Sequence, residues 1–155
     1  MHKLNLRDYQ EFIKTVITYD QQNESDYLKF GLHAELGEVA GVYAKYKRGD
    51  YNCSEMAEKL LYELGDVVWF VSRLLYLNNI SEVEIDSSAI IDLPVKDTIE
   101  YLINNRLDDY ISFLIVVDAI ARSYNTNIED LINMNIKKLS ARKNKNTIKG
   151  SGEQR

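Results

Sequence analysis

The chain has 155 residues, of which 45% are hydrophobic and 28% are charged, and this composition is typical of one compact soluble domain. Its single cysteine excludes a framework of intrachain disulfides and favours a reducing, cytoplasmic setting. No signal-peptide pattern is visible and no apolar run is long enough to span a bilayer, so we expect neither secretion nor a membrane partner.

The net charge of −5 is unevenly distributed along the chain. Residues 137–155 carry seven Lys or Arg residues and one acidic residue, whereas the part of the chain before them is acidic. An acidic body argues against duplex nucleic acid as a partner, and a short basic segment suits a small ligand that carries phosphates. We therefore predict a single domain over residues 1–155, with a basic, glycine-containing C-terminal tail over 143–155.

Three helices are predicted in the first half of the chain. Apolar residues recur at helical spacing over residues 5–19, and a second pattern of this kind runs over 26–47 and stops at Gly49. A third and more apolar pattern extends from Ser54, its expected N-cap, to about Asn78. Because its apolar residues are so numerous, we expect this third helix to be the most buried element.

The second half of the chain is predicted to be helical after a less regular stretch. We assign residues 80–93 to a loop with room for a short strand or helical turn. Residues 97–124 are expected to form either one long helix or two helices that are broken near residues 104–105. The capping-box pattern Thr126-x-x-Glu129 then predicts the start of a last helix. Together these elements predict an all-α helical bundle.

Two acidic motifs on successive predicted helices carry the strongest functional signal. The strings Glu35-Leu-Gly-Glu38-Val and Glu63-Leu-Gly-Asp66-Val are near copies of each other, 28 residues apart. Acids three residues apart project from one face of a helix, so an antiparallel pair of helices can direct all four carboxylates into one space. The spacing therefore predicts a cluster of four carboxylates.

A cluster of carboxylates requires a compensating positive charge. Carboxylates that are brought together repel one another and raise one another's pKa values. Hard divalent cations accept carboxylate oxygens as ligands, and Mg²⁺ usually keeps coordination positions for water and for substrate phosphates. We therefore predict that the four motif acids bind Mg²⁺, with Mn²⁺ as an alternative ion, against the phosphates of a polyphosphate ligand.

A glycine occupies the same position in both motifs. A glycine inside a helix costs about 1 kcal/mol relative to alanine, which makes Gly37 and Gly65 unfavourable for the helices themselves. Close approach of a neighbouring helix is the expected compensation at both positions.

Basic and aromatic residues near the motifs are candidates for contacts with substrate. Lys45 lies two helical turns beyond the first motif on the same face, and Lys59 precedes the second motif. Cationic side chains at these positions suit phosphate groups. Phe70 and Trp69 follow the second motif at helical spacing, so one of these rings can lie beside a base or sugar. Packing in the core is the alternative role for both rings.

The motifs and their surroundings resemble the MazG-like nucleoside triphosphate pyrophosphohydrolases, whose signature is a Glu-x-x-Glu pair and a Glu-x-x-Asp pair on adjacent helices. The string GLHAELGEVAGVYAKY is similar to the family's first metal helix, and EKLLYELGDVVWFV is similar to the second. The string NIKKLSARKNKNTIKGSGEQR is similar to the C-terminal helix and tail of phage-type members, with a departure at Glu153 and Gln154.

The resemblance implies an all-α fold and cleavage of a nucleoside triphosphate between its α and β phosphates, which yields a nucleoside monophosphate and pyrophosphate. It also implies that the four motif acids are the metal ligands, with Glu35 or Glu38 as the base that activates water. From the family's Asn-x-x-Lys-x-x-x-Arg pattern, we expect Asn135, Lys138 and Arg142 to bind substrate. A homodimer or homotetramer is expected as well.

Two other interpretations fit parts of the pattern. A di-iron carboxylate bundle uses similar acids, but it normally needs Glu-x-x-His pairs, and neither Glu38 nor Asp66 is a histidine. A non-enzymatic helical interaction module would instead use its acidic face to bind a basic partner. Metal-dependent binding of nucleotides would distinguish the enzyme from the interaction module.

Overall fold

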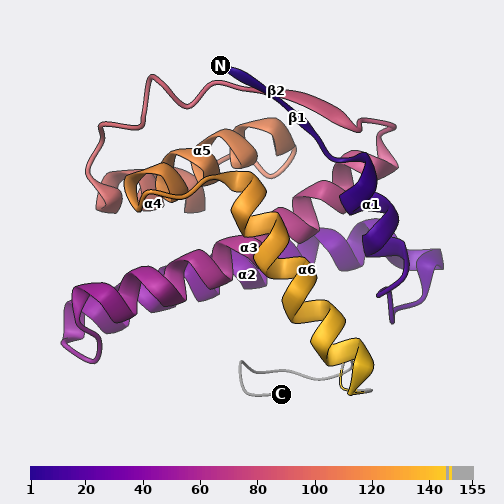
Figure 1. Ribbon diagram of the computed structural model, residues 1–155, viewed down its shortest axis with the longest axis horizontal. Helices are drawn as coiled ribbons and strands as arrows, with labels where there is room; N and C mark the ends of the chain where they lie inside the picture. The colour runs from indigo at the N-terminus through magenta and orange to yellow at the C-terminus, as the bar shows by residue number, and fades with distance from the viewer. Residues whose placement is uncertain (146, 148–155) are drawn as a thin grey trace.

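The computed structural model describes residues 1–145 and 147, and most of these residues are helical. In chain order the elements are β1 (His2–Asn5), α1 (Arg7–Lys14), the short 3₁₀ helix η1 (Gln21–Asn23), α2 (Glu24–Arg48), α3 (Cys53–Leu77), β2 (Glu82–Ile85), α4 (Val95–Ile103), α5 (Tyr110–Ser123) and α6 (Ile128–Asn144) (Figure 1). The predicted all-α class is correct for the bulk of the described chain, to which the structure adds a two-stranded sheet. None of the described helices is long and apolar enough to cross a membrane.

A tight turn joins the two longest helices, α2 and α3, and makes them antiparallel (Figure 1). Helix α2 ends at Gly49, whose φ of 92° lies in the left-handed region that favours glycine. Helix α3 begins after Asn52, whose side chain accepts a hydrogen bond from the Glu55 backbone N–H while the Glu55 carboxylate accepts one from the Asn52 backbone. The predicted stop at Gly49 is confirmed, but Ser54 is not the N-cap, because this capping box starts the helix two residues earlier.

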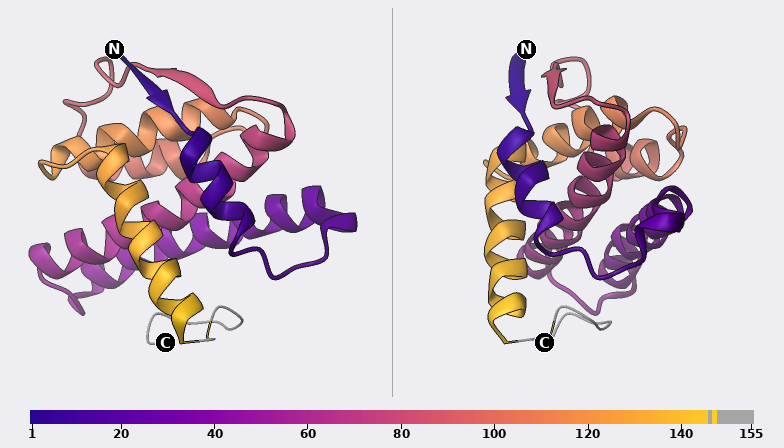
Figure 2. Two further views of the ribbon diagram at one scale, coloured as in Figure 1. Left: turned by 45° about the vertical axis from the view of Figure 1, so that its right-hand side comes forward. Right: turned by 90° about the vertical axis from the view of Figure 1, so that its right-hand side faces the viewer.

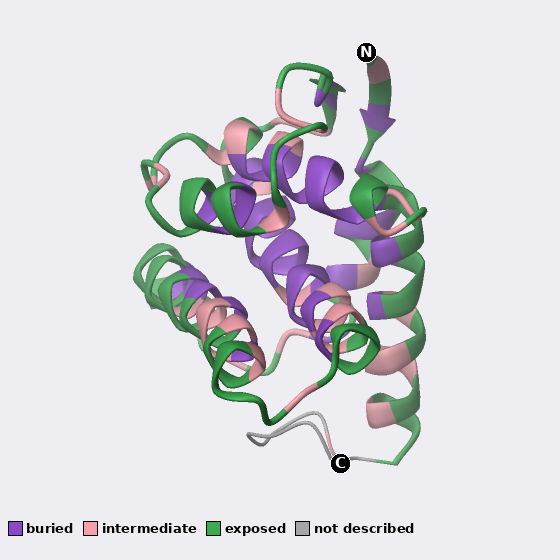
Figure 3. Ribbon diagram, turned by 90° about the vertical axis from the view of Figure 1, so that its left-hand side faces the viewer, coloured by how far each residue is buried: buried purple, intermediate pink, exposed green. Residues whose placement is uncertain are grey.

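Helix α3 is the centre of the core, as its apolar sequence predicts. It contacts α1, α2, α5 and α6. Helix α2 lies on one side of it, and α1 and α6 lie on the other (Figure 2). Buried residues run along α3 and along the inner faces of the surrounding helices, whereas the outer faces are exposed (Figure 3). Consequently side chains of α3 are positioned by helices that pack against it from different sides.

The N-terminal segment differs from its prediction. Helix α1 covers only Arg7–Lys14, and the residues before it form β1, which pairs antiparallel with β2 so that Leu4 lies opposite Val83. Leu4, Val83 and Ile85 are all buried, whereas the residues next to them in the chain are exposed. This alternation along β1 and β2 is the two-residue period of a strand and not the period of a helix. The short strand allowed within residues 80–93 is therefore present.

The C-terminal half forms three helices. The prediction of two helices over residues 97–124, in place of one long helix, is confirmed, because α4 ends at Ile103 and α5 begins after its N-cap Asp109. The start of α6 lies one residue later than predicted, since Asn127 is the N-cap and accepts a hydrogen bond from the Asp130 backbone N–H. Of the predicted tail over 143–155, residues 146 and 148–155 lie outside the described residues.

Candidate metal and nucleotide site

Three of the four motif acids lie together between α2 and α3. Glu35 on α2 and Glu63 and Asp66 on α3 present carboxylate oxygens that all lie within 4.8 Å of one another. Glu63 is only 2% exposed, while Glu35 and Asp66 are half-buried. The antiparallel turn places the two motifs at the same level along the helix pair, which explains why residues 28 positions apart meet here.

The fourth acid, Glu38, is placed differently. It is exposed to solvent and is not part of the group of three convergent carboxylates. It nevertheless lies near enough to Glu35 for its negative charge to raise the pKa of that residue. Glu38 therefore borders the cluster from its solvent side.

Glu35 shows the electrostatic consequence of this crowding. Its pKa is raised from 4.5 to about 8, first because burial penalises the charged form and then because Asp66, Glu38 and Glu63 are negatively charged. The positive charge of Lys138 opposes this effect without cancelling it. A divalent cation at this position would favour the charged form of Glu35 and offset the repulsion among the acids.

Helix α6 supplies the contacts of Asp66. The Lys138 ammonium group donates to both carboxylate oxygens of Asp66, and the Asn135 side-chain amide donates to one of them over 2.8 Å. The amide oxygen of Asn135 in turn accepts a 2.8 Å hydrogen bond from the Tyr9 hydroxyl on α1. Lys138 also lies 4.0 Å from the centre of the Tyr62 ring. Three helices, α1, α3 and α6, therefore hold the position of this carboxylate or of its partners.

The two motif glycines have different surroundings. A Cβ atom added at Gly65 would lie 3.6 Å from the Leu131 carbonyl oxygen and 3.7 Å from Cβ of Asn135, so α6 does pack closely against α3 there. A Cβ atom added at Gly37 would meet nothing within 4 Å among the described residues. The expectation of close helix approach is therefore correct for Gly65 and wrong for Gly37, because the Gly37 face of α2 is open to solvent.

A pocket of about 160 Å³ adjoins the carboxylates. Glu35, Asp66 and Arg142 give it a charged part, and four rings give it an aromatic part: Tyr19, Tyr27, Trp69 and Phe70. The Tyr19 and Tyr27 rings are stacked with centroids 4.0 Å apart, and the Trp69 and Phe70 rings meet edge to face at 4.8 Å. The pocket therefore places flat apolar surfaces next to convergent charges.

Most of the predicted substrate-binding residues lie at this site. Phe70 and Arg142 line the pocket, and Asn135 and Lys138 contact Asp66. All three α6 residues lie on one face of that helix, since their spacing is three and then four positions.

Lys45 and Lys59 do not line the pocket. Lys45 is exposed in the last turn of α2, and Lys59 lies 5.2 Å from the ring centre of Tyr51, near the start of α3. A step of seven residues keeps the helix face but moves about 10 Å along the axis, so both lysines are carried toward the α2–α3 turn. The structure therefore places Lys45 and Lys59 away from the pocket, and their predicted contacts with substrate stay predictions.

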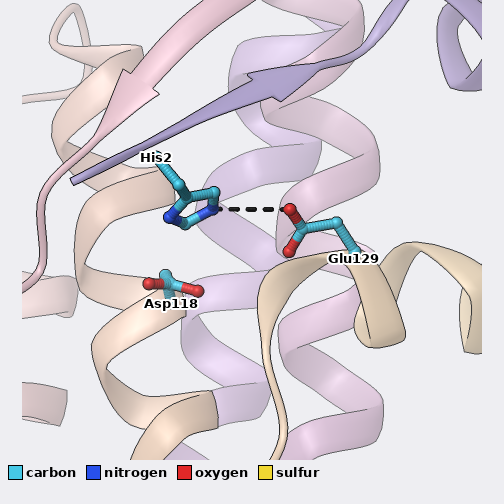
Figure 4. Close-up of side chains that lie close together, drawn as sticks. All are labelled: His2, Asp118 and Glu129. Atoms are coloured by element: carbon cyan, nitrogen blue, oxygen red, sulfur yellow. Dashed lines mark ion pairs between the residues drawn. The ribbon is translucent and has the colours of Figure 1, made fainter.

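A second cluster of possible metal ligands lies at the opposite end of α6. His2, Asp118 and Glu129 offer ligand atoms within 4.8 Å of one another, and His2 Nε2 lies 3.4 Å from Glu129 Oε1 (Figure 4). Asp118, however, is fully buried and already accepts a 2.7 Å hydrogen bond from Arg122 and a 2.8 Å hydrogen bond from Ser87. Because a guanidinium group already neutralises Asp118, we interpret this cluster as an anchor between β1, α5 and α6.

No family model matches the chain, and no curated protein or solved structure matches it either. The geometry of the carboxylates and of the pocket beside them is therefore the basis for assigning a function.

Proposed function

We propose that this protein is a Mg²⁺-dependent hydrolase that converts (deoxy)nucleoside triphosphates to nucleoside monophosphates and pyrophosphate. The observation that carries the proposal is the junction of three convergent carboxylates with a pocket that has an arginine and four aromatic rings. Carboxylates suit a hard cation, the arginine suits phosphates, and the rings suit a base. A nucleoside triphosphate with a bound Mg²⁺ combines a cation, phosphates and a base in one ligand.

The acids fit a divalent cation. Glu35, Glu63 and Asp66 offer hard oxygen donors from two helices, and burial together with the neighbouring negative charges raises the pKa of Glu35. These three residues would hold Mg²⁺, or Mn²⁺ in its place. When bound, the cation would supply positive charge for phosphate oxygens and stabilise the charge that develops during hydrolysis.

Two basic residues of α6 suit the phosphates. Lys138 and Arg142 are four residues apart, so their side chains project from the same face of the helix. Lys138 lies against Asp66 and Arg142 lines the pocket, which places both near the three carboxylates. We assign them the role of binding the phosphate oxygens of the substrate.

Glu38 or Glu35 would accept the proton of the attacking water. Glu38 borders the cluster from the solvent side without being one of the three convergent acids, so its carboxylate has room for a water molecule. Glu35 is one of the three convergent acids, so a water molecule bound at the cation would lie within reach of its carboxylate.

The aromatic part of the pocket favours a nucleotide over an inorganic polyphosphate. Stacking of one base on an aromatic side chain contributes about 1–3 kcal/mol and depends little on which base is present. Tyr27 and Phe70 lie with their ring centroids 6.1 Å apart, and Trp69 completes this part of the pocket. A ligand without a base would leave these rings uncovered.

We also infer that the protein forms a homodimer or homotetramer. Phe30 on α2 is 75% exposed, and contact with a second subunit at this position would remove its ring from water. Light scattering at micromolar concentration tests this point, and a monomeric mass would contradict it.

The test of the proposed function is a screen of ribonucleoside and deoxyribonucleoside triphosphates in Mg²⁺, with the products separated by ion-exchange chromatography. We expect a nucleoside monophosphate and pyrophosphate from the wild type. Glu63→Gln should abolish the reaction, whereas Glu58→Gln changes an exposed acid on the same helix and should leave it intact. Circular dichroism checks that both variants are folded. An absence of Mg²⁺-dependent turnover would leave the non-enzymatic interaction module as the better reading.

A further inference from the structure

A buried ion pair lies beyond the carboxylate cluster, near the aromatic part of the pocket. Arg73 on α3 is 3% exposed and Glu24 at the start of α2 is 7% exposed. The Arg73 Nε donates to Glu24 Oε1 over 2.6 Å, and its Nη2 donates to Glu24 Oε2 over 3.2 Å. Replacing a buried ion pair with apolar residues is often neutral or stabilising, so stability alone is a weak explanation for this pair.

The pair has a third member, Tyr19. The Tyr19 hydroxyl donates a 2.7 Å hydrogen bond to Oε1 of Glu24, the same oxygen that Arg73 Nε contacts. Burial alone would raise the pKa of Glu24, but hydrogen bonds from Arg73 and Tyr19 lower it, so the acceptor stays ionised. Arg73 is itself fixed, because its guanidinium carbon lies 4.5 Å from the centre of the Tyr76 ring.

Tyr19 is the residue through which this pair reaches the pocket. It lies between α1 and η1, in a segment without regular secondary structure, and its ring lines the pocket. The ring stacks on Tyr27 and meets Trp69 edge to face at 6.4 Å. No helix fixes its backbone, so its hydroxyl contact and its ring contacts decide where this part of the pocket lies.

We propose that Glu24 and Arg73 are positioning residues that hold Tyr19 as a fixed wall of the pocket, and that this wall sets the affinity for the planar ring of the substrate. The inference rests on the proposed function, because it assigns the aromatic part of the pocket to a base. It predicts an effect on binding of ligands that have a base and none on binding of phosphates alone. Glu24 and Arg73 themselves do not touch substrate.

Tyr19→Phe is the first test, because it removes the hydroxyl contact and keeps the ring. We expect the KM for a nucleoside triphosphate to rise about 5-fold, as for loss of one hydrogen bond, with kcat near the wild-type value. The inhibition constant of inorganic tripolyphosphate should stay unchanged, since this ligand has no base. Tyr101→Phe removes a hydroxyl from an exposed tyrosine on α4 and is the matched control.

A double-mutant cycle separates positioning from general stability. Glu24→Leu alone leaves a buried guanidinium without its counter-ion and can unfold the protein, so we combine it with Arg73→Met. The Glu24→Leu/Arg73→Met protein has no acceptor for the Tyr19 hydroxyl, so it should show the same rise in KM, and adding Tyr19→Phe to it should raise KM no further. Two results would overturn the proposal. The first is that the effects on KM of Tyr19→Phe and of the changes at Glu24 and Arg73 add up. The second is that the changes at Glu24 and Arg73 lower Tm without changing KM, which would show that the ion pair only stabilises the fold.

Trp69 offers a readout that is independent of turnover. It is the single tryptophan of the chain and lines the same pocket, so titration with a nucleotide should change its fluorescence. We expect the wild type to respond at about 5-fold lower nucleotide concentration than Tyr19→Phe. Equal KM values and equal titrations for the two proteins would overturn this inference and leave the proposed function intact. No turnover and no fluorescence response in the wild type would overturn both.

Discussion

Lys138 on α6 donates its ammonium group to both carboxylate oxygens of Asp66 on α3. The two residues are 72 positions apart, and the Asn135 amide on the same helix makes a further contact with Asp66. The ammonium group occupies oxygens that a divalent cation would also use. The C-terminal helix therefore influences both the charge of the acidic cluster and its capacity to bind a cation.

Lys138→Met should strengthen binding of Mn²⁺ in the absence of nucleotide several-fold, because it removes a positive charge that competes for Asp66. The same change should lower turnover of nucleotides, since it removes a proposed phosphate contact. Calorimetric titration with Mn²⁺ measures the first effect. Lys137→Met changes the exposed neighbouring residue and should behave as the wild type. Weaker cation binding in Lys138→Met would show that this lysine supports the cation site.

The raised pKa of Glu35 predicts how stability depends on pH in the presence of a chelator. The pKa is about 8 in the folded protein and near 4.5 in the unfolded chain, so between these values the folded state holds the extra proton. The free energy of unfolding should therefore fall as pH rises from 5 to 8, by at most about 1.4 kcal/mol per pH unit from this residue. Urea unfolding at several pH values should show a shallower decrease for Glu35→Gln than for the wild type. Identical slopes would mean that Glu35 does not titrate in this range.

Gly31→Ala should weaken nucleotide binding although it adds only a methyl group. A Cβ atom at Gly31 would overlap the ring of Phe70, which is buried and lines the pocket, so the ring must move. Gly41→Ala on the same helix meets nothing within 4 Å among the described residues and should stabilise the helix by up to about 1 kcal/mol. Fluorescence titration and thermal unfolding compare the two variants. Equal nucleotide affinity in both would show that the position of Phe70 does not matter for binding.

Arg142→Ala should raise the KM for a nucleoside triphosphate about 10-fold, because Arg142 lines the pocket and a charge-assisted contact to phosphate would be lost. Lys143→Ala removes an exposed charge one residue later and serves as the comparison. Steady-state kinetics on the two proteins provide the measurement. If both raise KM equally, the basic end of α6 acts only through its overall charge.

The acidic cluster could be predicted from sequence because its geometry is mostly local. Residues three apart on a helix share a face, and a turn at Gly49 makes two neighbouring helices antiparallel. Lys45 shows the limit of the same rule, since sharing a face with an acid does not keep a side chain at the same level along the axis. The spacing of residues on a helix predicts which face a side chain occupies more reliably than it predicts which side chains lie close together.

The aromatic part of the pocket could not be predicted in the same way. Tyr19 comes from a segment without periodicity, and its acceptor Glu24 is held by Arg73, which is 49 residues from Glu24 in the sequence. Tyr9 meets Asn135 across 126 positions. Such contacts are decided by how helices pack and not by local pattern, and for the same reason the pairing of β1 with β2 was missed.

The position of attack tests the central claim most directly. Hydrolysis of a deoxynucleoside triphosphate in water enriched in heavy oxygen, with Mg²⁺ present, marks the phosphorus that the water attacks. If the carboxylates direct attack at the α-phosphorus, the label should appear in the nucleoside monophosphate and be absent from pyrophosphate. Label in pyrophosphate, or release of orthophosphate with a nucleoside diphosphate, would contradict the assignment.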